Sequence, residues 1–259
     1  MTESKDADYD FNMVAVCEAV WGEGYISPGG PEEVERIVGD VVLPSKEILD
    51  IGCGSGGIDR FLAKRYHPSK ITGVDVEPSL ITHCIEQARL EGLSDLLSYG
   101  CIEPGPLPFE SESFDVVFTK DSLIHIEDKH AICSEVFRVL RSGGTFIASD
   151  WMSGDGPVSP ELQRYIDLED IGFGMAGQTK YRDALVSAGF SGIRFIDRND
   201  WYRELARDEL SRLRGELFEP LSEKVGRDYT EHTIETWSAM CVVLDRGELR
   251  PTHWHATKP

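Results

Sequence analysis

A glycine-rich turn in the first quarter of the chain constrains the fold more than any other feature. Residues 48 to 57 read Ile-Leu-Asp-Ile-Gly-Cys-Gly-Ser-Gly-Gly, an apolar run that ends in a carboxylate and then a turn. Glycines let the backbone turn sharply and approach a ligand where a Cβ would collide. Helical spacing follows from Ile58 to Tyr66, so the N–H groups at the start of a helix would point at that ligand.

A second carboxylate ends the next apolar run, Ile71-Thr-Gly-Val-Asp75, 25 residues after Asp50. In an open parallel sheet the carboxyl ends of the strands meet at one edge, where ligands bind. Two carboxylates beside a glycine turn form a site for a nucleoside that carries a ribose. The sequence therefore predicts a nucleoside-binding α/β domain, and the rest of the chain must decide which nucleoside.

Two nucleoside ligands fit the glycine turn. Gly52, Gly54 and Gly57 match the G-x-G-x-x-G pattern of dinucleotide-binding folds. Three blocks favour S-adenosylmethionine (SAM) instead: Asp50 within D-x-G-x-G, Ser113-Phe-Asp-Val-Val-Phe118 followed by Lys120-Asp121, and Val139-Leu-Arg-Ser-Gly-Gly-Thr-Phe-Ile147. In that order, over residues 40 to 150, these blocks resemble the class I SAM-dependent methyltransferases.

Alternating apolar and helical stretches predict a Rossmann-like, doubly wound α/β domain with a mostly parallel seven-stranded sheet. The expected strands are 46–51, 70–75, 95–101, 114–118, 144–150, 192–197 and 252–257. The expected helices are 11–21, 31–38, 58–66, 78–91, 129–140, 160–172, 180–188, 201–225 and 229–242. We expect a single domain over 1–259, with an N-terminal helical lid (1–40), a SAM-binding core (41–150) and substrate-binding helices with the last strands (151–259).

Composition narrows the partners. The net charge of −20 argues against nucleic acid as substrate, because phosphate repulsion would oppose binding without a basic patch. Apolar runs are too short to span a membrane, and the polar, acidic N-terminus is unlike a signal peptide. The six cysteines lack metal-ligand or disulfide spacing. We expect a cytoplasmic protein with a small-molecule substrate, no metal site, and an oligomeric state that the sequence leaves open.

Beyond the generic fold, the chain resembles phosphoethanolamine N-methyltransferases of the compact protozoan type. The resemblance rests on Gly22-Glu-Gly-Tyr-Ile-Ser-Pro-Gly-Gly30, on Asp-Ser-Leu-Ile-His125 and on Ala256-Thr-Lys-Pro. It implies that Tyr9 and His125 form a catalytic pair that also latches the N-terminal segment over the cofactor. It further implies cofactor contacts from Ile26 and Ser27, with Lys120 as a basic residue near the cofactor.

The remaining cofactor contacts follow from the strand ends. We expect Asp50 to face the methionine ammonium, Asp75 the ribose hydroxyls, and Glu103 the adenine amine, with Ile102 against the ring. The full set expected to contact SAM is Tyr9, Ile26, Ser27, Asp50, Gly52, Gly54, Ser55, Asp75, Val76, Ile102, Glu103 and Lys120.

The expected acceptor site departs from the family pattern. The resemblance places an arginine of the phosphate anchor at Glu169, a lysine at Met240 and a tyrosine at Trp151. A carboxylate where a phosphate should bind is electrostatically unfavourable, although Arg164 or Arg182 could substitute if the helical register shifts. The residues expected to contact the acceptor are Tyr25, Asp121, Trp151, Tyr165, Glu169, Tyr181, Trp201 and Met240.

These observations leave several functions open. The first is N-methylation of a small amine, in which Tyr9 and His125 orient the nitrogen and accept or relay its proton. The alternatives are S-methylation of a thioether or thiol such as a methionine derivative, which needs no general base, and a true phosphoethanolamine N-methyltransferase. A protein that binds SAM without catalysis is the alternative from another class.

Overall fold

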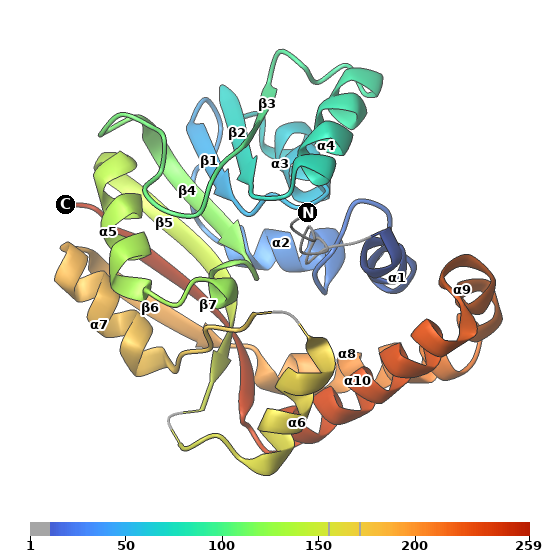
Figure 1. The fold of residues 1–259 in the computed structure, drawn as a ribbon. Coiled ribbons are helices and arrows are strands. Elements are labelled where there is room, and N and C mark those ends of the chain that lie inside the picture. The colour runs from blue at the N-terminus through green and yellow to red at the C-terminus, as the bar shows by residue number, and fades with distance from the viewer. Residues whose placement is uncertain (1–10, 155, 171) are drawn as a thin grey trace, which may run out of the picture.

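The structure, a computed structural model, describes residues 11–154, 156–170 and 172–259. Its centre is one seven-stranded sheet in the order β3-β2-β1-β4-β5-β7-β6 (Figure 1). The strands β1 to β5 are parallel and β7 runs antiparallel to both of its neighbours. The bounds are β1 Glu47–Ile51, β2 Lys70–Asp75, β3 Leu97–Cys101, β4 Phe114–Lys120, β5 Leu140–Ser153, β6 Ser191–Asp197 and β7 Leu249–Thr257. The predicted doubly wound, mostly parallel sheet is confirmed.

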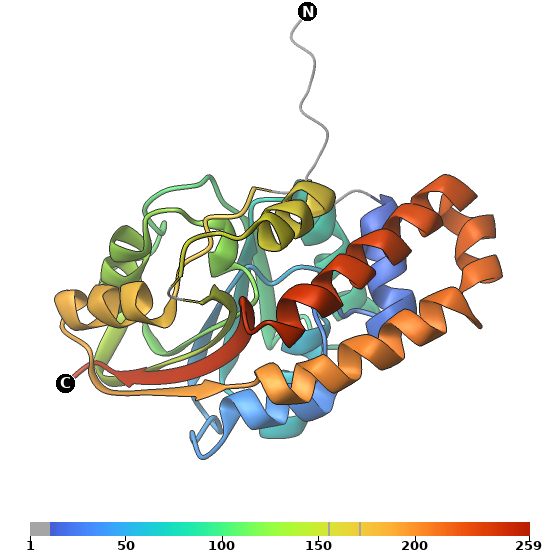
Figure 2. The ribbon, with the colours of Figure 1, turned by 90° about the horizontal axis from the view of Figure 1, so that it is seen from below.

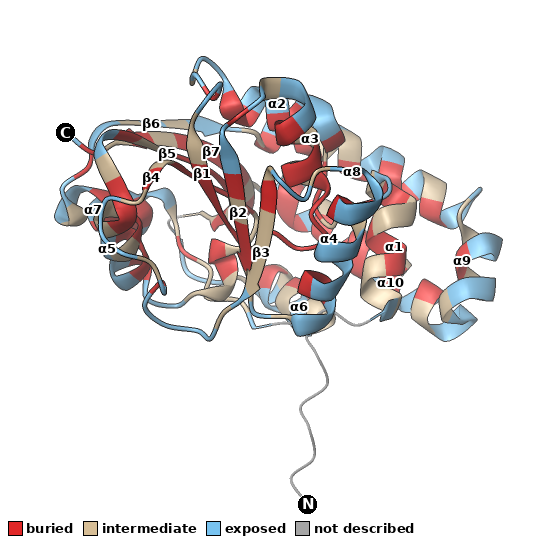
Figure 3. Ribbon diagram, turned by 90° about the horizontal axis from the view of Figure 1, so that it is seen from above, coloured by how far each residue is buried: buried red, intermediate tan, exposed pale blue. Residues whose placement is uncertain are grey.

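Helices cover both faces of the sheet, so successive strand residues enter opposite cores. In β4, Val117 packs with α5 (Lys129–Val139) and α7 (Gln178–Ala188), whereas Val116 and Phe118 pack with the helices of the other face. Those helices are α2 (Gly30–Val38), α3 (Gly57–Tyr66) and α4 (Pro78–Leu90). This two-sided burial, visible as red strands in Figure 3, explains why the strands are apolar at consecutive positions.

A helical arm extends beyond the sheet (Figure 2). It comprises α8 (Asn199–Arg214), α9 (Phe218–Val225) and α10 (Arg227–Asp245). Helices α6 (Pro160–Glu169) and α1 (Phe11–Trp21) pack against it and share its apolar core. The arm therefore buries its own hydrophobic cluster between segments far apart in the sequence.

Several boundaries differ from the sequence prediction. The helix predicted at 201–225 is two helices, because the chain turns at Gly215, where the Leu217 N–H donates to the Arg212 carbonyl at 2.9 Å. The helix predicted at 160–172 ends at Glu169. Strand β5 begins at Leu140, which pairs with Phe114 of β4, and continues to Ser153 because residues 145–153 pair with β7. In the described part of the chain, none of the helices has the length and apolar composition to cross a bilayer.

Helix α2 is fixed to the far end of the sheet by the buried Glu33. Arg198 at the start of α8 donates two hydrogen bonds to the Glu33 carboxylate, both at 2.8 Å. His253 of β7 lies 2.8 Å from the same carboxylate. A single buried side chain thus joins the N-terminal helices, the last strand and the arm.

Candidate functional site

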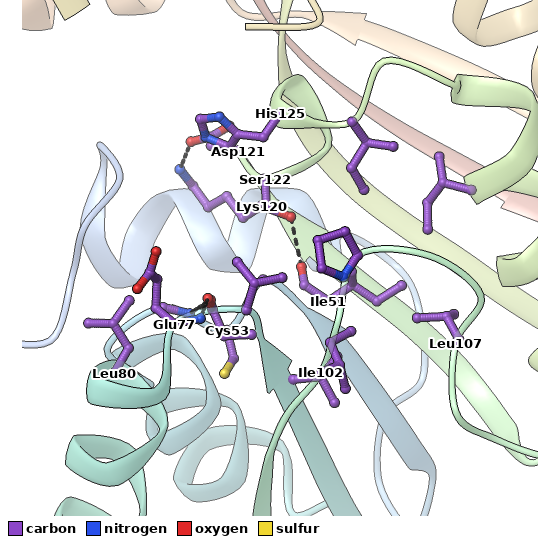
Figure 4. Close-up of a pocket in the computed structure, with 18 of the residues that line it drawn as sticks. Ile51, Cys53, Glu77, Leu80, Ile102, Leu107, Lys120, Asp121, Ser122 and His125 are labelled. Atoms are coloured by element: carbon purple, nitrogen blue, oxygen red, sulfur yellow. Dashed lines mark hydrogen bonds and ion pairs between the residues drawn. The ribbon is translucent and has the colours of Figure 1, made fainter. Parts of the chain in front are cut away.

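A cavity of about 850 Å³ opens at the carboxyl ends of β1, β2 and β4 (Figure 4). One wall is the glycine turn after β1, and another is formed by the end of β4 and the segment after it, with Lys120, Asp121 and His125. The ends of β2 and β3 and one side of α5 complete it. This is the edge at which open α/β sheets bind their ligands.

The glycine turn is shaped by its contacts with the neighbouring strands. Gly52 has φ +75°, and a Cβ there would lie 2.3 Å from the Ser122 Oγ. The Gly54 N–H donates to the Asp75 carboxylate at 2.9 Å, and the Glu77 N–H donates to its other oxygen at 3.1 Å. Asp75 therefore holds the turn and lines the cavity at the same time.

The loop before α2 lies directly on this turn. The Gly57 N–H donates to the Gly24 carbonyl at 3.0 Å, and a Cβ on Gly57 would lie 2.1 Å from that oxygen. Ile26 covers Gly54, where a Cβ would meet the Ile26 Cδ1 at 2.4 Å. Only glycines permit this approach, which brings Ile26 and Ser27 into the cavity wall.

The segment after β4 is tied to the end of β1. Thr119 and Ser122 both donate to the Ile51 carbonyl, at 2.7 and 2.9 Å. Asp121 has φ +57°, an uncommon conformation for a residue with a side chain, and its carboxylate pairs with the Lys120 ammonium. His125 follows in a short 3-10 turn, η1 (Leu123–His125), where its Nδ1 lies 3.0 Å from the Gly172 carbonyl oxygen.

Most residues expected to contact SAM line this cavity. They are Ile26, Ser27, Gly52, Gly54, Ser55, Asp75, Val76, Ile102, Glu103 and Lys120. His125, Tyr25 and Asp121 line it too, and burial raises the pKa of Tyr25 to about 12. Tyr9 lies outside the described residues, so its pairing with His125 stays a prediction.

Asp50 lies beneath the cavity instead of in its wall. It is 2 % exposed and lies near Asp59 of α3, which is fully buried. Burial, reinforced by the charge of Asp59, raises the pKa of Asp50 well above its usual range, and burial raises that of Asp59 to about 7. Because two buried carboxylates this close oppose each other's ionisation, their environment favours a proton shared by the pair.

Six residues expected to contact the acceptor lie outside the cavity wall of the described residues: Trp151, Tyr165, Glu169, Tyr181, Trp201 and Met240. Tyr181 is buried in the core between α7 and the sheet, where its hydroxyl donates to Asp150 of β5. Trp201 stacks on the Arg198 guanidinium, 4.6 Å from its ring centroid. These two side chains serve packing between elements in this structure.

The other four lie in or beside the core of the helical arm. Trp151 meets Tyr202 at 4.9 Å between ring centroids, and the Tyr202 hydroxyl oxygen lies 3.9 Å from the Met240 sulfur. Tyr165 is 6.3 Å from Phe173, whose ring is 5.8 Å from that of His125. An aromatic path therefore runs from His125 into the arm.

Trp21, Trp151, Tyr165, Tyr202 and Trp237 form the aromatic core of the arm. A buried carboxylate lies at its centre. Glu209 of α8 is 1 % exposed and accepts hydrogen bonds from Trp21 at 2.8 Å, Tyr202 at 3.0 Å and Trp237 at 3.1 Å. Burial raises the pKa of Glu209 despite these three donors, and burial likewise raises that of Glu169 to about 7. The core beside the cavity thus holds acidic groups.

Sequence reasoning missed part of the cavity wall. The cavity is also lined by Cys53, Ser122, Ile126, the 104–107 loop, residues 127–128, and Ala131, Ile132, Ser134 and Glu135 of α5. The Pro104-Gly-Pro106 sequence after β3 marks a loop, but only the fold brings it opposite α5. Among the described residues, no group of three or more His, Cys, Asp or Glu side chains could hold a metal ion.

Comparison with known proteins gives three findings. A family described as a methyltransferase domain matches residues 49–148. Sarcosine/dimethylglycine N-methyltransferase of Halorhodospira halochloris is 32% identical over 235 residues, covering 83% of this chain and 80% of that protein. Phosphoethanolamine N-methyltransferase 1 of Zea mays is 30% identical over 242 residues, covering 93% of this chain and 47% of that protein.

Solved structures show the same fold. Phosphoethanolamine N-methyltransferase 2 of Haemonchus contortus, in complex with phosphomonomethylethanolamine and S-adenosylhomocysteine, superimposes with a TM-score of 0.89 at 22% identity. That match covers 98% of this chain and 59% of the other. The chain spans about half the length of the plant relatives that it matches.

The fold and the cavity define a Rossmann-like protein that binds a nucleoside between its glycine turn and an acidic strand end. With the similarity to the Halorhodospira protein over most of both chains, the assignment is specific: the chain belongs to the class I SAM-dependent methyltransferases. SAM is the cofactor of this family, and the cavity fits it. The glycine turn with Gly52 and Gly54 lines one side of the 850 Å³ cavity, and Asp75 lines it from the end of β2.

Proposed function

We propose that the chain transfers the methyl group of SAM to the nitrogen of a small amine that carries no phosphate. The observation that carries this proposal is the charge of the region beside His125. The positions that the family resemblance assigns to a phosphate anchor hold Glu169 and Met240, and the neighbouring aromatic core encloses Glu209. Without the arginine and the lysine, a dianionic group has no fixed positive charge to bind there. A carboxyl group in place of the arginine suits an amine acceptor better than a phosphate.

Bound SAM supplies a methyl group on a positively charged sulfur, so the electrophile needs no further activation. The chain's own task is alignment, which contributes roughly 7–11 kcal/mol to such transfers. In our proposal Asp75 binds the ribose hydroxyls, Ile102 and Glu103 bind the adenine, and the loop of Ile26 and Ser27 covers the cofactor. Residues 1–40 act as the lid that excludes water.

An amine attacks only when it is neutral, whereas a free alkylammonium has a pKa near 10. The proposal therefore gives His125 the role of orienting the nitrogen and accepting or relaying its proton, with Tyr9 as its expected partner. In the proposal Asp121, whose charge is balanced by Lys120 in the cavity wall, accepts a hydrogen bond from the amine N–H. Cation–π attraction from the aromatic path would favour a methylated ammonium product.

The relatives support amines as acceptors. The Halorhodospira relative is named for sarcosine and dimethylglycine, and a relative in Actinopolyspora halophila for glycine, sarcosine and dimethylglycine. These amines carry no phosphate, as the proposed absence of a phosphate anchor requires. We therefore take glycine, sarcosine and dimethylglycine as the first acceptors to test.

Phosphoethanolamine is the second candidate acceptor. The 30% identity with the maize enzyme over 93% of this chain favours it, as does the fold shared with the Haemonchus enzyme. Under this alternative Arg164 or Arg182 would have to act as the anion anchor. Arg164 pairs with Glu235 at 2.9 Å on the surface, and the Arg182 guanidinium lies 4.9 Å from the centre of the Phe195 ring. S-methylation of a thioether remains the alternative that needs no base.

The deciding experiment compares kcat/KM for glycine, sarcosine, dimethylglycine, phosphoethanolamine and methionine with SAM as donor. We expect turnover on at least one amine without phosphate, at least tenfold above phosphoethanolamine. Preferred turnover of phosphoethanolamine would overturn the argument from Glu169 and Met240. Turnover of methionine alone, unchanged in His125→Ala, would favour S-methylation. Binding of SAM with no turnover of any acceptor would favour a non-catalytic protein.

A further inference from the structure

We propose that Lys129, a buried residue that lines no part of the cavity, positions His125 by fixing the turn that carries it. The inference rests on the role proposed for His125. It assigns Lys129 as a positioning residue for methyl transfer.

The argument begins with the hydrogen bonds of the turn. The Lys129 ammonium donates to the Leu123 carbonyl at 2.6 Å and also to the Ile126 carbonyl. These two carbonyls stand on either side of residues 124 and 125. The Ile124 carbonyl between them accepts the Gly174 N–H at 2.6 Å. Three successive supports thus fix the backbone from which the His125 side chain projects.

The environment of Lys129 shows that this arrangement is costly. Lys129 is fully buried and is the first residue of α5, where a positive charge opposes the helix dipole. Burial lowers the pKa of Lys129 to about 8, an effect that the nearby Asp150 opposes. A buried, unfavourably placed ammonium that donates two hydrogen bonds to the same turn indicates a specific positional role.

The groups around Lys129 also connect the turn to residues 151–259, the part of the chain expected to bind the acceptor. Its ammonium lies 5.3 Å from the centre of the Tyr181 ring, and the Tyr181 hydroxyl donates to Asp150. Asp150 is followed by Trp151, at the edge of the aromatic core. On the other side of the turn, the His125 Nδ1 lies 3.0 Å from the Gly172 carbonyl oxygen. Lys129 therefore lies between the hydrogen-bonded pair of Tyr181 and Asp150 on one side and His125 on the other.

The test compares Lys129→Met, which keeps the length of the side chain but removes its donors, with Lys180→Met. Lys180 is exposed and reaches the Glu127 carbonyl at 3.3 Å, so it is a matched lysine beside the same turn. The assay measures kcat with SAM and sarcosine, Kd for SAM by calorimetry, and Tm. We expect Lys129→Met to lower kcat at least tenfold with Kd for SAM within threefold, and Lys180→Met to change neither.

A double-mutant cycle with His125→Ala separates positioning from general damage. If Lys129 acts through His125, Lys129→Met should have no further effect on kcat in the His125→Ala protein. A further tenfold loss there, a loss of SAM affinity as large as the loss of kcat, or wild-type kcat in Lys129→Met would each overturn the inference. If His125→Ala alone keeps full amine turnover, the proposed function fails instead.

A readout that needs no acceptor covers the remaining cases. The imidazole signals of His125 are assigned in histidine-labelled protein by their loss in His125→Ala. Lys129→Met should shift these signals, whereas Lys180→Met should leave them in place. Unchanged signals in Lys129→Met would overturn the inference. If Lys129→Met does not fold, Lys129→Gln, which retains a shorter donor, is measured in its place with the same expectations.

Discussion

At the scale of single residues, the site depends on buried polar groups beneath the visible cavity wall. Below the glycine turn, carboxylate oxygens of Asp50 and Asp59 and the Tyr99 hydroxyl are buried close together, and Asp59 interacts with both Asp50 and Tyr99. Ionising a carboxyl group in such a buried cluster costs stability. The cofactor turn therefore rests on an unfavourable, proton-binding cluster.

This cluster predicts an unusual dependence of stability on pH. Burial raises the pKa of Asp59 to about 7 from a usual value of 3.8, so the folded state binds more protons between these pH values. Stability contributed by this proton is present at low pH and is lost as pH rises through 7. Asp59→Asn has no carboxyl group to ionise at this position and therefore avoids this loss of stability. Its Tm should exceed that of wild type by an amount that grows from pH 4 to pH 7.

Thermal melts across this pH range measure that difference. Asp95→Asn, at an exposed position, serves as the control and should change Tm little at any pH. A Tm difference between Asp59→Asn and wild type that stays constant from pH 4 to pH 8 would contradict the assigned protonation.

The sequence correctly predicted which residues lie at the strand ends, but it did not predict which side chains would surround them. D-x-G-x-G correctly located the glycine turn, and the residues around it line the cavity. The same pattern did not predict that Asp50 would lie under the turn, because that depends on Asp59 entering from α3. Periodicity locates a carboxylate on an element, but only tertiary packing decides whether it meets ligand or another side chain.

At the scale of elements, two contacts fix the N-terminal helices on the nucleoside-binding core. The loop before α2 meets the start of α3 through Gly24 and Gly57, and α2 is joined to β7 and α8 through Glu33. The first contact faces the cavity and the second lies away from it. We therefore expect them to affect cofactor binding and stability, respectively.

Gly57→Ala tests the first contact. The new Cβ would displace the Gly24 carbonyl and break the hydrogen bond it accepts, which costs about 1 kcal/mol, or roughly fivefold in Kd for SAM. Gly100→Ala, at a position with open space around the Cβ, should leave Kd unchanged. Calorimetric titration with SAM measures both variants. Equal affinity of Gly57→Ala and wild type would show that the loop does not contribute to the cofactor site.

Glu33→Gln tests the second contact. Although burial opposes its ionisation, hydrogen bonds from His253 and Arg198 lower the pKa of Glu33 to about 2. The stabilisation is therefore present above pH 4.5 and is lost as pH falls from 4.5 towards 2. Removing one partner of a buried ion pair costs about 3–5 kcal/mol, so Glu33→Gln should be strongly destabilised at pH 7.

Urea unfolding at pH 7 and at pH 3 gives the free energies. The neighbouring, exposed Glu32→Gln is the control and should unfold like wild type. The destabilisation of Glu33→Gln should shrink at pH 3. A destabilisation below 1 kcal/mol at pH 7 would contradict this account of how α2 is held.

The succession of elements followed from the sequence, whereas their ends did not always. Alternating apolar and amphipathic stretches correctly predicted the sheet, because each strand and helix has its own period. The break at Gly215 was missed because charged residues continue with helical spacing on both sides of it. An isolated glycine inside such a pattern is compatible with a continuous helix or with a turn.

At the scale of the whole molecule, a net charge of −20 surrounds a site that we propose for an amine. Such a charge destabilises the compact state through self-repulsion. It also attracts cationic molecules, and added salt weakens this attraction by screening the charges. The residues of the acceptor region could not be predicted one by one. The aromatic core beside it joins β5, α1, α6, α8 and α10. Local sequence patterns do not determine which side chains of such distant elements meet.

Self-repulsion predicts stabilisation by salt. Raising NaCl from about 0.01 M to 1 M shortens the screening length from roughly 30 to 3 Å, so Tm at pH 7.5 should rise. At pH 5, where carboxylates begin to bind protons, the rise should be smaller. Thermal melts in both buffers measure the effect. A Tm at pH 7.5 that is unchanged or lower in 1 M NaCl would contradict it.

The central claim is that the cavity brings the methyl group of SAM to the nitrogen of a small amine. The most direct test supplies SAM with a deuterated methyl group together with glycine, sarcosine or dimethylglycine, and follows the products by mass spectrometry. The account predicts that the deuterated methyl group appears on the nitrogen of at least one of these amines and that His125→Ala greatly slows its transfer. Transfer only to phosphoethanolamine or to a sulfur acceptor, or none to these amines while SAM is bound, would contradict it.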